Sequence, residues 1–228
     1  MSKFRRACER DGFSGALRLA ARNLAVMPAA FRPRAKKTWF DAKYGVDTDV
    51  SVEVEDLGVN GPSKTFACAY APVTVNILED AMRLLNIDHR DFTFIDLGSG
   101  KGRALMLAGG YPFRHIIGVE FSAALHLIAM RNIETYSGPR LCSDIRCVCG
   151  DAAAFRLPDI PLVILLYNPF VGDVMRQVVS NIEKSVTCSP RPVYVLYISP
   201  INAETLGESQ VLREIGRTDD CRIFAARE

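Results

Sequence analysis

Short apolar runs alternate with amphipathic segments from residue 92 to the end of the chain. Five runs are apolar along their length, as strands buried on both faces of a parallel sheet are, and they cover residues 92–97, 115–120, 144–149, 162–167 and 192–198. The segments between them predict helices over 101–109, from Ser122 onward and over 172–185. Two last runs, 211–215 and 221–227, flank the polar turn GRTDD and predict a hairpin.

This alternation predicts an α/β fold with a doubly wound, mostly parallel, Rossmann-like sheet of seven strands and an antiparallel hairpin at its C-terminal end. In such sheets ligands bind beyond the carboxyl ends of the strands, near the point where the strand order reverses. The residues that follow the predicted strands are therefore the first candidates for a site, and they lie at 98–102, 120–121, 150–151, 168–170 and 199–200.

Charge is spread unevenly over the predicted parts of the chain. These parts are a basic, helical N-terminal extension, a polar connecting arm and a main domain, over residues 1–45, 46–69 and 70–228. Residues 1–40 hold ten Lys or Arg residues against two acidic ones, whereas the formal net charge of the whole chain is only +2. Residues 41–228 therefore carry a formal net charge of −6, and the extension carries the positive charge.

The basic extension has several possible contacts. Residues 1–44 could bind an anionic surface or a nucleic acid, or fold back onto the acidic body. Within them, Gly15–Met27 predicts a first helix that packs on the main domain, lies on a membrane surface or contacts a partner. Trp39 and Phe40 are expected to anchor the extension to the main domain.

Composition narrows the compartment and the class of protein. No apolar stretch reaches the ~18 residues of a membrane span, so no integral span is expected. The first residues carry no apolar secretory signal, and the seven cysteines are an odd number, so a reducing, cytoplasmic location is expected with mostly buried thiols. Cys142, Cys147 and Cys149 lack the paired Cys-x₂-Cys arms of a zinc site, so no metal is expected.

The glycine-rich stretch FIDLGSGKGRAL (94–105) excludes two common phosphate-binding loops. A triphosphate loop needs Ser or Thr after its lysine, but Gly102 follows Lys101 here. A dinucleotide loop needs a third glycine where Arg103 stands. Arg103 could instead contact a carboxylate or form a pair on the helix surface. The spacing that remains is D-x-G-x-G-x-G, which starts at Asp96.

Acidic residues at consecutive strand ends favour a nucleoside with a cationic tail. Asp96 can bind a cationic group or order the loop, and Glu120 can accept both hydroxyls of a ribose. Asp151, with the amide of Ala152, could meet the edge of an adenine. Each residue also has a structural explanation, because Glu120 could be a solvated strand end and Asp151 a helix cap.

Four segments together resemble the ordered motifs of class I S-adenosylmethionine-dependent methyltransferases, over Tyr70 to Arg227. They are FIDLGSGKGRAL, GVEFS, GDAAAF and YNPF. Within this superfamily the chain is similar to the Dot1-like branch and to small bacterial methyltransferases of unassigned substrate, whose leader resembles FDAKYGVDT (40–48). The resemblance implies an enzyme that uses S-adenosylmethionine, with its cofactor domain over residues 70–228.

The resemblance also implies which residues bind the cofactor. The methionine portion would lie against the glycine loop, the ribose at Glu120 with Phe121 beside it, and the adenine at Asp151 and Ala152. Tyr70, in the segment Tyr70–Pro72, would close over the cofactor. The glycine-loop residues implied are Asp96, Gly98, Ser99, Gly100 and Gly102.

Asn168, Pro169 and Phe170 are the expected catalytic residues. Asn168, which would also touch the cofactor, can accept hydrogen bonds from an amino group and so aim its lone pair at a methyl group. Pro169 stiffens the turn, and Phe170 offers a ring face to a planar base or a cationic amine. The motif has one proline where base-methylating relatives have two. It could also be only a turn that ends the strand.

The sequence therefore predicts a methyltransferase that acts on an amino nitrogen, with protein lysine as one candidate. One alternative is a nucleic-acid methyltransferase that uses the basic extension. Another is a protein that binds S-adenosylmethionine without catalysis. His89, His115 and His126 lie away from the expected site, and structural roles are predicted for all three.

Overall fold

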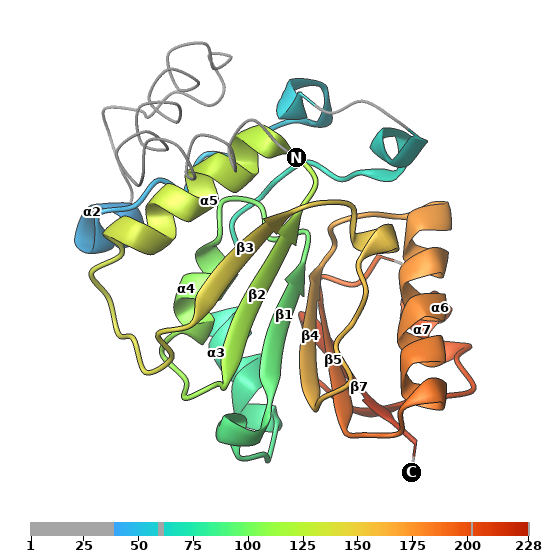
Figure 1. The fold of residues 1–228 in the computed structure, drawn as a ribbon. Coiled ribbons are helices and arrows are strands. Elements are labelled where there is room, and N and C mark those ends of the chain that lie inside the picture. Colours follow the sequence, from blue (N-terminus) through green and yellow to red (C-terminus); the bar gives the residue numbers. More distant parts are fainter. Residues whose placement is uncertain (1–38, 59–61, 202, 228) are drawn as a thin grey trace, which may run out of the picture. The chain divides into compact units, whose positions relative to one another are not determined.

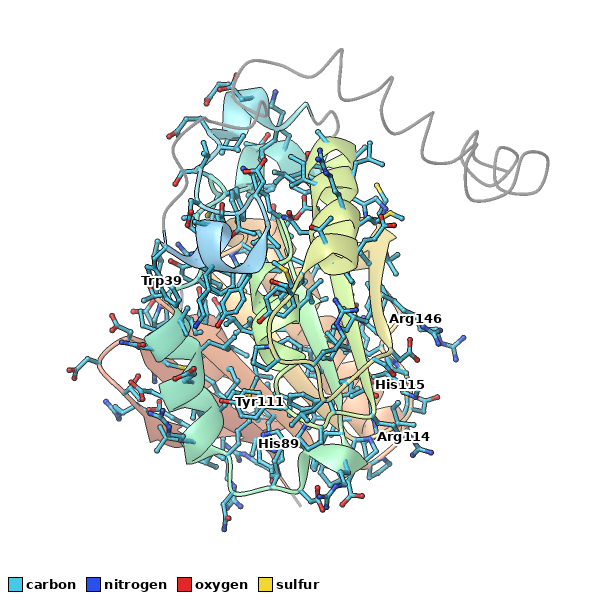
Figure 2. All side chains as sticks on the ribbon, turned by 90° about the vertical axis from the view of Figure 1, so that its left-hand side faces the viewer. Trp39, His89, Tyr111, Arg114, His115 and Arg146 are labelled. Atoms are coloured by element: carbon cyan, nitrogen blue, oxygen red, sulfur yellow. The ribbon has the colours of Figure 1, made fainter. Side chains whose placement is uncertain are left out.

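The computed structural model describes residues 39–58, 62–201 and 203–227, which all belong to one compact unit over residues 37–228. Predictions for the basic extension before residue 39, including the helix over Gly15–Met27, lie outside the described residues. The described part opens with the short helix α2 (Trp39–Tyr44). Its Phe40 is buried as expected, but Trp39 is 61% exposed and lies on the outside of α2 (Figure 2).

A seven-stranded mixed sheet forms the centre of the fold (Figure 1). Its strands are β1 (Thr93–Leu97), β2 (His115–Glu120), β3 (Ile145–Cys149), β4 (Leu162–Tyr167), β5 (Val193–Ile198), β6 (Leu212–Arg217) and β7 (Cys221–Ala226). The order is β3-β2-β1-β4-β5-β7-β6. Strands β1 to β5 are parallel, and β7 is antiparallel to β5 and β6. The predicted fold class is confirmed, and the strand order reverses between β1 and β4.

Helices cover both faces of the sheet (Figure 1). One face carries α3 (Val75–Leu84) and α4 (Arg103–Ala108), with α5 (Ala123–Thr135) beside β3. The other face carries α6 (Gly172–Cys188) and α7 (Ala203–Gly207). Short 3₁₀ turns lie in the connections, at Val54–Leu57, Pro62–Phe66, His89–Asp91 and Ala152–Ala154. Each described helix is too short or too polar to cross a membrane.

The core lies on both faces of the central strands because side chains alternate along each strand. Ile164 of β4 packs toward α6, whereas the next residue, Leu165, packs toward α3 and α4. The residues of β4 from Leu162 to Leu166 are fully buried. Since both faces are covered, the strand can be apolar at every position, as its sequence is.

Strand β3 departs from the prediction. It lies at the edge of the sheet, and Val148 and Cys149 are exposed. Its apolar run is therefore not buried on both faces, because the described helices leave Val148 and Cys149 uncovered. The expectation of buried thiols is confirmed for Cys142 and wrong for Cys149, while Cys147 is half-buried.

The helix after the glycine loop begins later than predicted, at Arg103 rather than at residue 101. Gly102 precedes it with a φ of 83°, which is the left-handed region that favours glycine. The helix predicted over 172–185 is confirmed and continues to Cys188. These differences shorten one element and lengthen another without changing the order of elements.

Truncation in the central strand should cost far more stability than truncation at the edge. We expect Ile164→Ala to lower the free energy of unfolding by about 2–5 kcal/mol, because Ile164 is fully buried and its loss leaves a cavity. The matched change Ile215→Ala, at a side chain that is 46% exposed, should cost less than about 1 kcal/mol. Urea unfolding measures both, and equal losses would contradict this description of the core.

Candidate functional site

A cavity lies at the carboxyl edge of the sheet, where the strand order reverses between β1 and β4. It contains about 840 Å³ of empty space, part of it open to solvent. The predicted site residues that line it are Tyr70, Asp96, Gly98, Ser99, Gly100, Glu120, Phe121, Asp151, Ala152, Pro169 and Phe170. Gly102 and Asn168, also predicted, are not among its lining residues. The cavity thus brings together segments that are far apart in the sequence.

The glycine loop makes room for side chains that line the cavity. Gly98 has a φ of 92°, and a Cβ there would lie 2.3 Å from Cβ of Pro169. Gly100 has a φ of 52°, and a Cβ there would lie 2.3 Å from the ring of Tyr70. Both positions therefore require glycine for two reasons, the backbone angle and the close contact. Gly102 instead packs against Ala129 of α5.

Glu120 connects the glycine loop to the next strand. Its carboxylate is 3% exposed and accepts the N–H of Gly100 at 2.8 Å and the N–H of Ser122 at 2.7 Å. The N–H of Phe121 also bonds to this carboxylate, so about one of its roughly four acceptor positions remains for a ligand hydroxyl. The sequence placed this residue at the strand end correctly, but it is buried rather than solvated.

Two buried carboxyl groups meet at this edge of the sheet. Burial and, to a smaller extent, the charge of Glu120 together raise the pKa of Asp96 to about 8. Burial also raises the pKa of Glu120 to about 7, against the lowering effect of backbone N–H donors from Ser122, Gly100 and Phe121. A cationic group in the cavity would favour the ionised form of both carboxyl groups, so the pair suits a positively charged ligand.

Asp151 follows β3 and lines the same cavity. It caps the short turn Ala152–Ala154, since its Oδ1 accepts the N–H of Ala153 at 2.9 Å. Its Oδ2 accepts a hydrogen bond from the hydroxyl of Ser63 at 2.5 Å. Capping and lining are compatible, because each oxygen retains a free acceptor position.

The end of β4 is conformationally strained. Asn168 has a φ of 43°, which is rare for a residue other than glycine, and it precedes a proline. Its Oδ1 is buried and has no hydrogen-bond partner among the described residues. Pro169 packs on Gly98, and the 6% exposed ring of Phe170 lines the cavity. The predicted catalytic segment is thus adjacent to the glycine loop.

The predicted connecting arm forms a wall of the cavity, a role that its mostly polar sequence did not predict. Ala67 bridges Phe170 in antiparallel fashion, and the N–H of Cys68 donates to the carbonyl of Pro169 at 3.2 Å. The lining residues from this arm are Leu57, Ser63, Ala67, Cys68 and Ala69, and Tyr70, Ala71 and Val73 follow directly after it. The apolar run FACAYAPV (66–73) is the signal that could have indicated a buried segment.

The three histidines lie away from the cavity lining. His89 packs on Tyr111 and Phe113. Nδ1 of His115 lies 2.7 Å from Oδ2 of Asp144. Figure 2 shows His89 and His115 toward the amino ends of the strands, opposite the edge that bears the cavity. Among the described residues, no group of three or more His, Cys, Asp or Glu side chains could hold a metal ion.

No family model matches the sequence, and no match was found among curated proteins. Solved structures match in fold. An RNA methyltransferase from Salinibacter ruber, in complex with S-adenosyl-L-homocysteine, is 14% identical, with a TM-score of 0.47 over 68% of this chain and 92% of its own. A human methyltransferase 10 domain containing protein is 16% identical, with a TM-score of 0.47 over 83% of this chain and 92% of its own. A ribosomal protein L11 methylase from Lactobacillus delbrueckii subsp. bulgaricus is 13% identical, with a TM-score of 0.46 over 68% of this chain and 77% of its own.

Strand β7 lies antiparallel between β5 and β6, so the predicted C-terminal hairpin is present. What each of these structures binds or methylates belongs to that protein, and the Dot1-like branch stays a prediction. The function of this chain therefore has to be inferred from its own cavity.

The buried acids should make the ligand-free protein less stable as the pH rises. The folded state holds protons on Asp96 and Glu120 up to about pH 7–8, whereas the unfolded chain releases them near pH 4. The folded state therefore binds more protons in this window, so its free energy of unfolding falls as pH rises.

We expect Asp96→Asn to flatten this pH dependence, because the amide has no proton to release. Denaturant titrations at pH 5, 6, 7 and 8 compare the unchanged chain with the variant. The unchanged chain should lose stability relative to the variant at each step upward. Parallel curves would show that Asp96 does not titrate in this window.

Proposed function

We propose that this chain is a methyltransferase that uses S-adenosylmethionine and transfers the methyl group to an amino nitrogen. One observation carries this proposal, which is the convergence of Asp96, Glu120 and Asp151 on one cavity beside the segment Asn168–Phe170. These acids come from the ends of β1, β2 and β3, which are neighbours in the sheet. Their chemistry suits three parts of one nucleoside ligand.

The residues present fit the cofactor in chemical type. Asp96 suits the ammonium group of the amino-acid end, because a cation beside this buried acid would favour its ionised form. Glu120 keeps an acceptor position for a ribose hydroxyl, and Asp151 keeps acceptor positions for the amino group of an adenine. When bound, S-adenosylmethionine supplies a methyl group that is already activated on a positively charged sulfur.

The end of β4 supports an amino nitrogen as the acceptor. A buried acceptor atom without a partner costs about 1–3 kcal/mol, and an N–H donor from a substrate would remove that cost at Oδ1 of Asn168. Asn168 lies between Tyr167 and Pro169, which both line the cavity. A hydrogen bond from one N–H of an amine would hold the nitrogen in place, so that its lone pair can point toward the methyl group.

A protein lysine is the acceptor class that we favour. The wall formed by Phe170 and the arm residues Ala67 and Ala69 is apolar, so it can pack against the methylene groups of an extended side chain. An apolar wall also disfavours a charged ammonium, and this favours the neutral amine that has a lone pair to donate. The alignment of nucleophile and methyl group then supplies the main part of the catalysis.

Blocking the glycine loop should abolish cofactor binding. We expect Gly100→Arg to remove binding of S-adenosylmethionine in calorimetry, since φ is 52° there and the ring of Tyr70 fills the space beside it. The matched control is Gly207→Arg, because nothing lies within 4 Å of a Cβ at that exposed position. Circular dichroism checks that both variants fold. Unchanged binding by a folded Gly100→Arg variant would refute this placement of the cofactor.

Removing the amide of Asn168 should impair transfer more than cofactor binding. With labelled cofactor and fractionated cell extract, we expect Asn168→Ala to lower the rate of label transfer about a hundredfold, because the acceptor nitrogen is no longer aligned. Its dissociation constant for S-adenosyl-L-homocysteine should stay within about threefold of the original, since the cavity lining is unchanged. Equal transfer rates would exclude a role for Asn168.

The same labelling separates the acceptor classes. Label that is released by protease and recovered as methylated lysine supports the lysine proposal. Label that is released by nuclease instead would favour nucleic acid as the acceptor. Cofactor binding by the unchanged chain without any transfer to extract would indicate a binding protein.

A further inference from the structure

A buried polar cluster formed by Asp41, Thr48, Asp49 and Arg103 connects residues 41–49 to the glycine loop. At its centre is Asp41 of α2, which is 2% exposed. From the following residues of the chain its carboxylate accepts hydrogen bonds from the N–H and hydroxyl of Thr48, both at 2.6 Å, and from the N–H of Asp49 at 2.9 Å. These bonds close residues 41–49 into a compact loop. Buried carboxylates with several donors fix local geometry, because each lost bond leaves an unpaired charge.

Arg103 fastens this loop to the cavity. It is the first residue of α4, directly after the glycine loop, and is 8% exposed. Its Nε donates to the hydroxyl of Thr48 at 2.7 Å, and its Nη2 pairs with Asp41 at 3.4 Å and with Asp49. The guanidinium also lies 4.6 Å from the ring centre of Phe40. The arginine that replaces a third glycine in the sequence is therefore an internal anchor.

Thr48 connects the cluster to Tyr70 by a hydrogen bond. The hydroxyl of Tyr70 donates to the carbonyl oxygen of Thr48 at 2.8 Å, and burial raises the pKa of Tyr70 well above its usual value, so the hydroxyl keeps its proton. The backbone of Tyr70 also exchanges two hydrogen bonds with Val52, at 2.8 and 3.0 Å. Held in this way, the ring lies against Gly100. Tyr70 thus has a defined position in the cavity wall.

A second connection runs parallel to the first. Asn132 of α5 donates from Nδ2 to the carbonyls of Asp47 and Lys101, both at 2.9 Å, and accepts the N–H of Asp47 at 2.8 Å. Nζ of the buried Lys101 lies 3.4 Å from Asp47. The loop over residues 41–49 is therefore joined to the glycine loop at two points, Lys101 and Arg103.

The charges in the cluster indicate a positioning role for Arg103 rather than a role in binding an anion. Two carboxylates of the chain itself, Asp41 and Asp49, already face its guanidinium. A third carboxylate from a ligand would add repulsion from both acids. Arg103 itself lines the cavity, and its guanidinium also fixes the position of Thr48 and, through it, of Tyr70.

We propose that Asp41, Thr48 and Arg103 are positioning residues that hold Tyr70 against Gly100 and so build the wall for the amino-acid end of the cofactor. This inference rests on the proposed function. A wall that is fixed before binding spares the ligand the cost of ordering it. Loosening the cluster should therefore weaken ligands that have an amino-acid end and leave others nearly unchanged.

The test compares two ligands that differ at that end. S-adenosyl-L-homocysteine has the amino-acid end, and 5′-methylthioadenosine lacks it. We expect Thr48→Val to weaken S-adenosyl-L-homocysteine about five- to tenfold, the equivalent of about one hydrogen bond, and 5′-methylthioadenosine less than about twofold. Calorimetry on the full chain measures both dissociation constants.

Two matched variants serve as controls. Thr48→Ser keeps the hydroxyl that bonds Asp41 and Arg103, so it should restore the affinity of the unchanged chain. Thr135→Val removes a hydroxyl of α5 that donates to the carbonyl oxygen of Gly45 at 3.2 Å. Gly45 belongs to the loop over residues 41–49 but not to the cluster, so this change should alter the affinity for neither ligand. Tyr70→Phe removes only the bond to Thr48 and should show the same selective loss, even if Thr48→Val fails to fold.

The outcomes separate this inference from the function on which it rests. Binding of both ligands by the unchanged chain, with equal weakening or no weakening in Thr48→Val and Tyr70→Phe, overturns the positioning role and leaves the proposed function standing. No binding of either ligand by the unchanged chain overturns both. Amide exchange adds a readout without ligand, since Thr48→Val should speed exchange at the N–H of Tyr70, and an unchanged rate there counts against the role.

Discussion

The buried carboxylate of Glu120 holds the site together. It accepts N–H groups from Gly100 and Ser122, so one side chain joins the bend after β1 to the start of α5. Burial of this charge is costly, as its raised pKa of about 7 shows, and the backbone donors offset only part of the cost. Because the bend is fixed, Pro169 and Tyr70 can pack closely on its glycines. The shape of the cavity therefore depends on a hydrogen-bonded acid that belongs to the neighbouring strand.

The same bend shows why the glycines of this loop do more than permit sharp backbone angles. A ligand-binding loop of this type is usually explained by the close approach of the ligand to the backbone. Here the side chains of the protein make that approach, Pro169 at Gly98 and the ring of Tyr70 at Gly100. The wall opposite the loop is thus built from two segments that lie far from it in sequence. Any change that displaces one of the three segments alters the cavity as a whole.

The sequence was sufficient for the features that depend on local pattern. The apolar continuity of residues 162–167 predicted a central strand, and the spacing from Asp96 to Gly102 predicted the bend and its place at a strand end. Features that depend on distant partners were not predictable in this way. The end of the arm forms a cavity wall because Ala67 pairs with Phe170, and its apolar run FACAYAPV (66–73) could indicate burial but not this partner. The edge position of β3 likewise follows from the topology of the sheet, since its apolar run looks like that of an inner strand.

The residues that cost free energy of folding and the residues that stabilise the fold lie in different parts of the structure. The desolvated acid Asp96, the strained Asn168 and its unpaired Oδ1 all lie at the carboxyl edge of the sheet. The fully buried side chains of β4, from Leu162 to Leu166, precede Asn168 in the sequence. They contribute hydrophobic stabilisation without burying a polar group. A residue can persist in a rare conformation only when the surrounding structure determines its position. The central strand meets that condition for Asn168, so the end of the cavity beside this residue can remain in place before any ligand is bound.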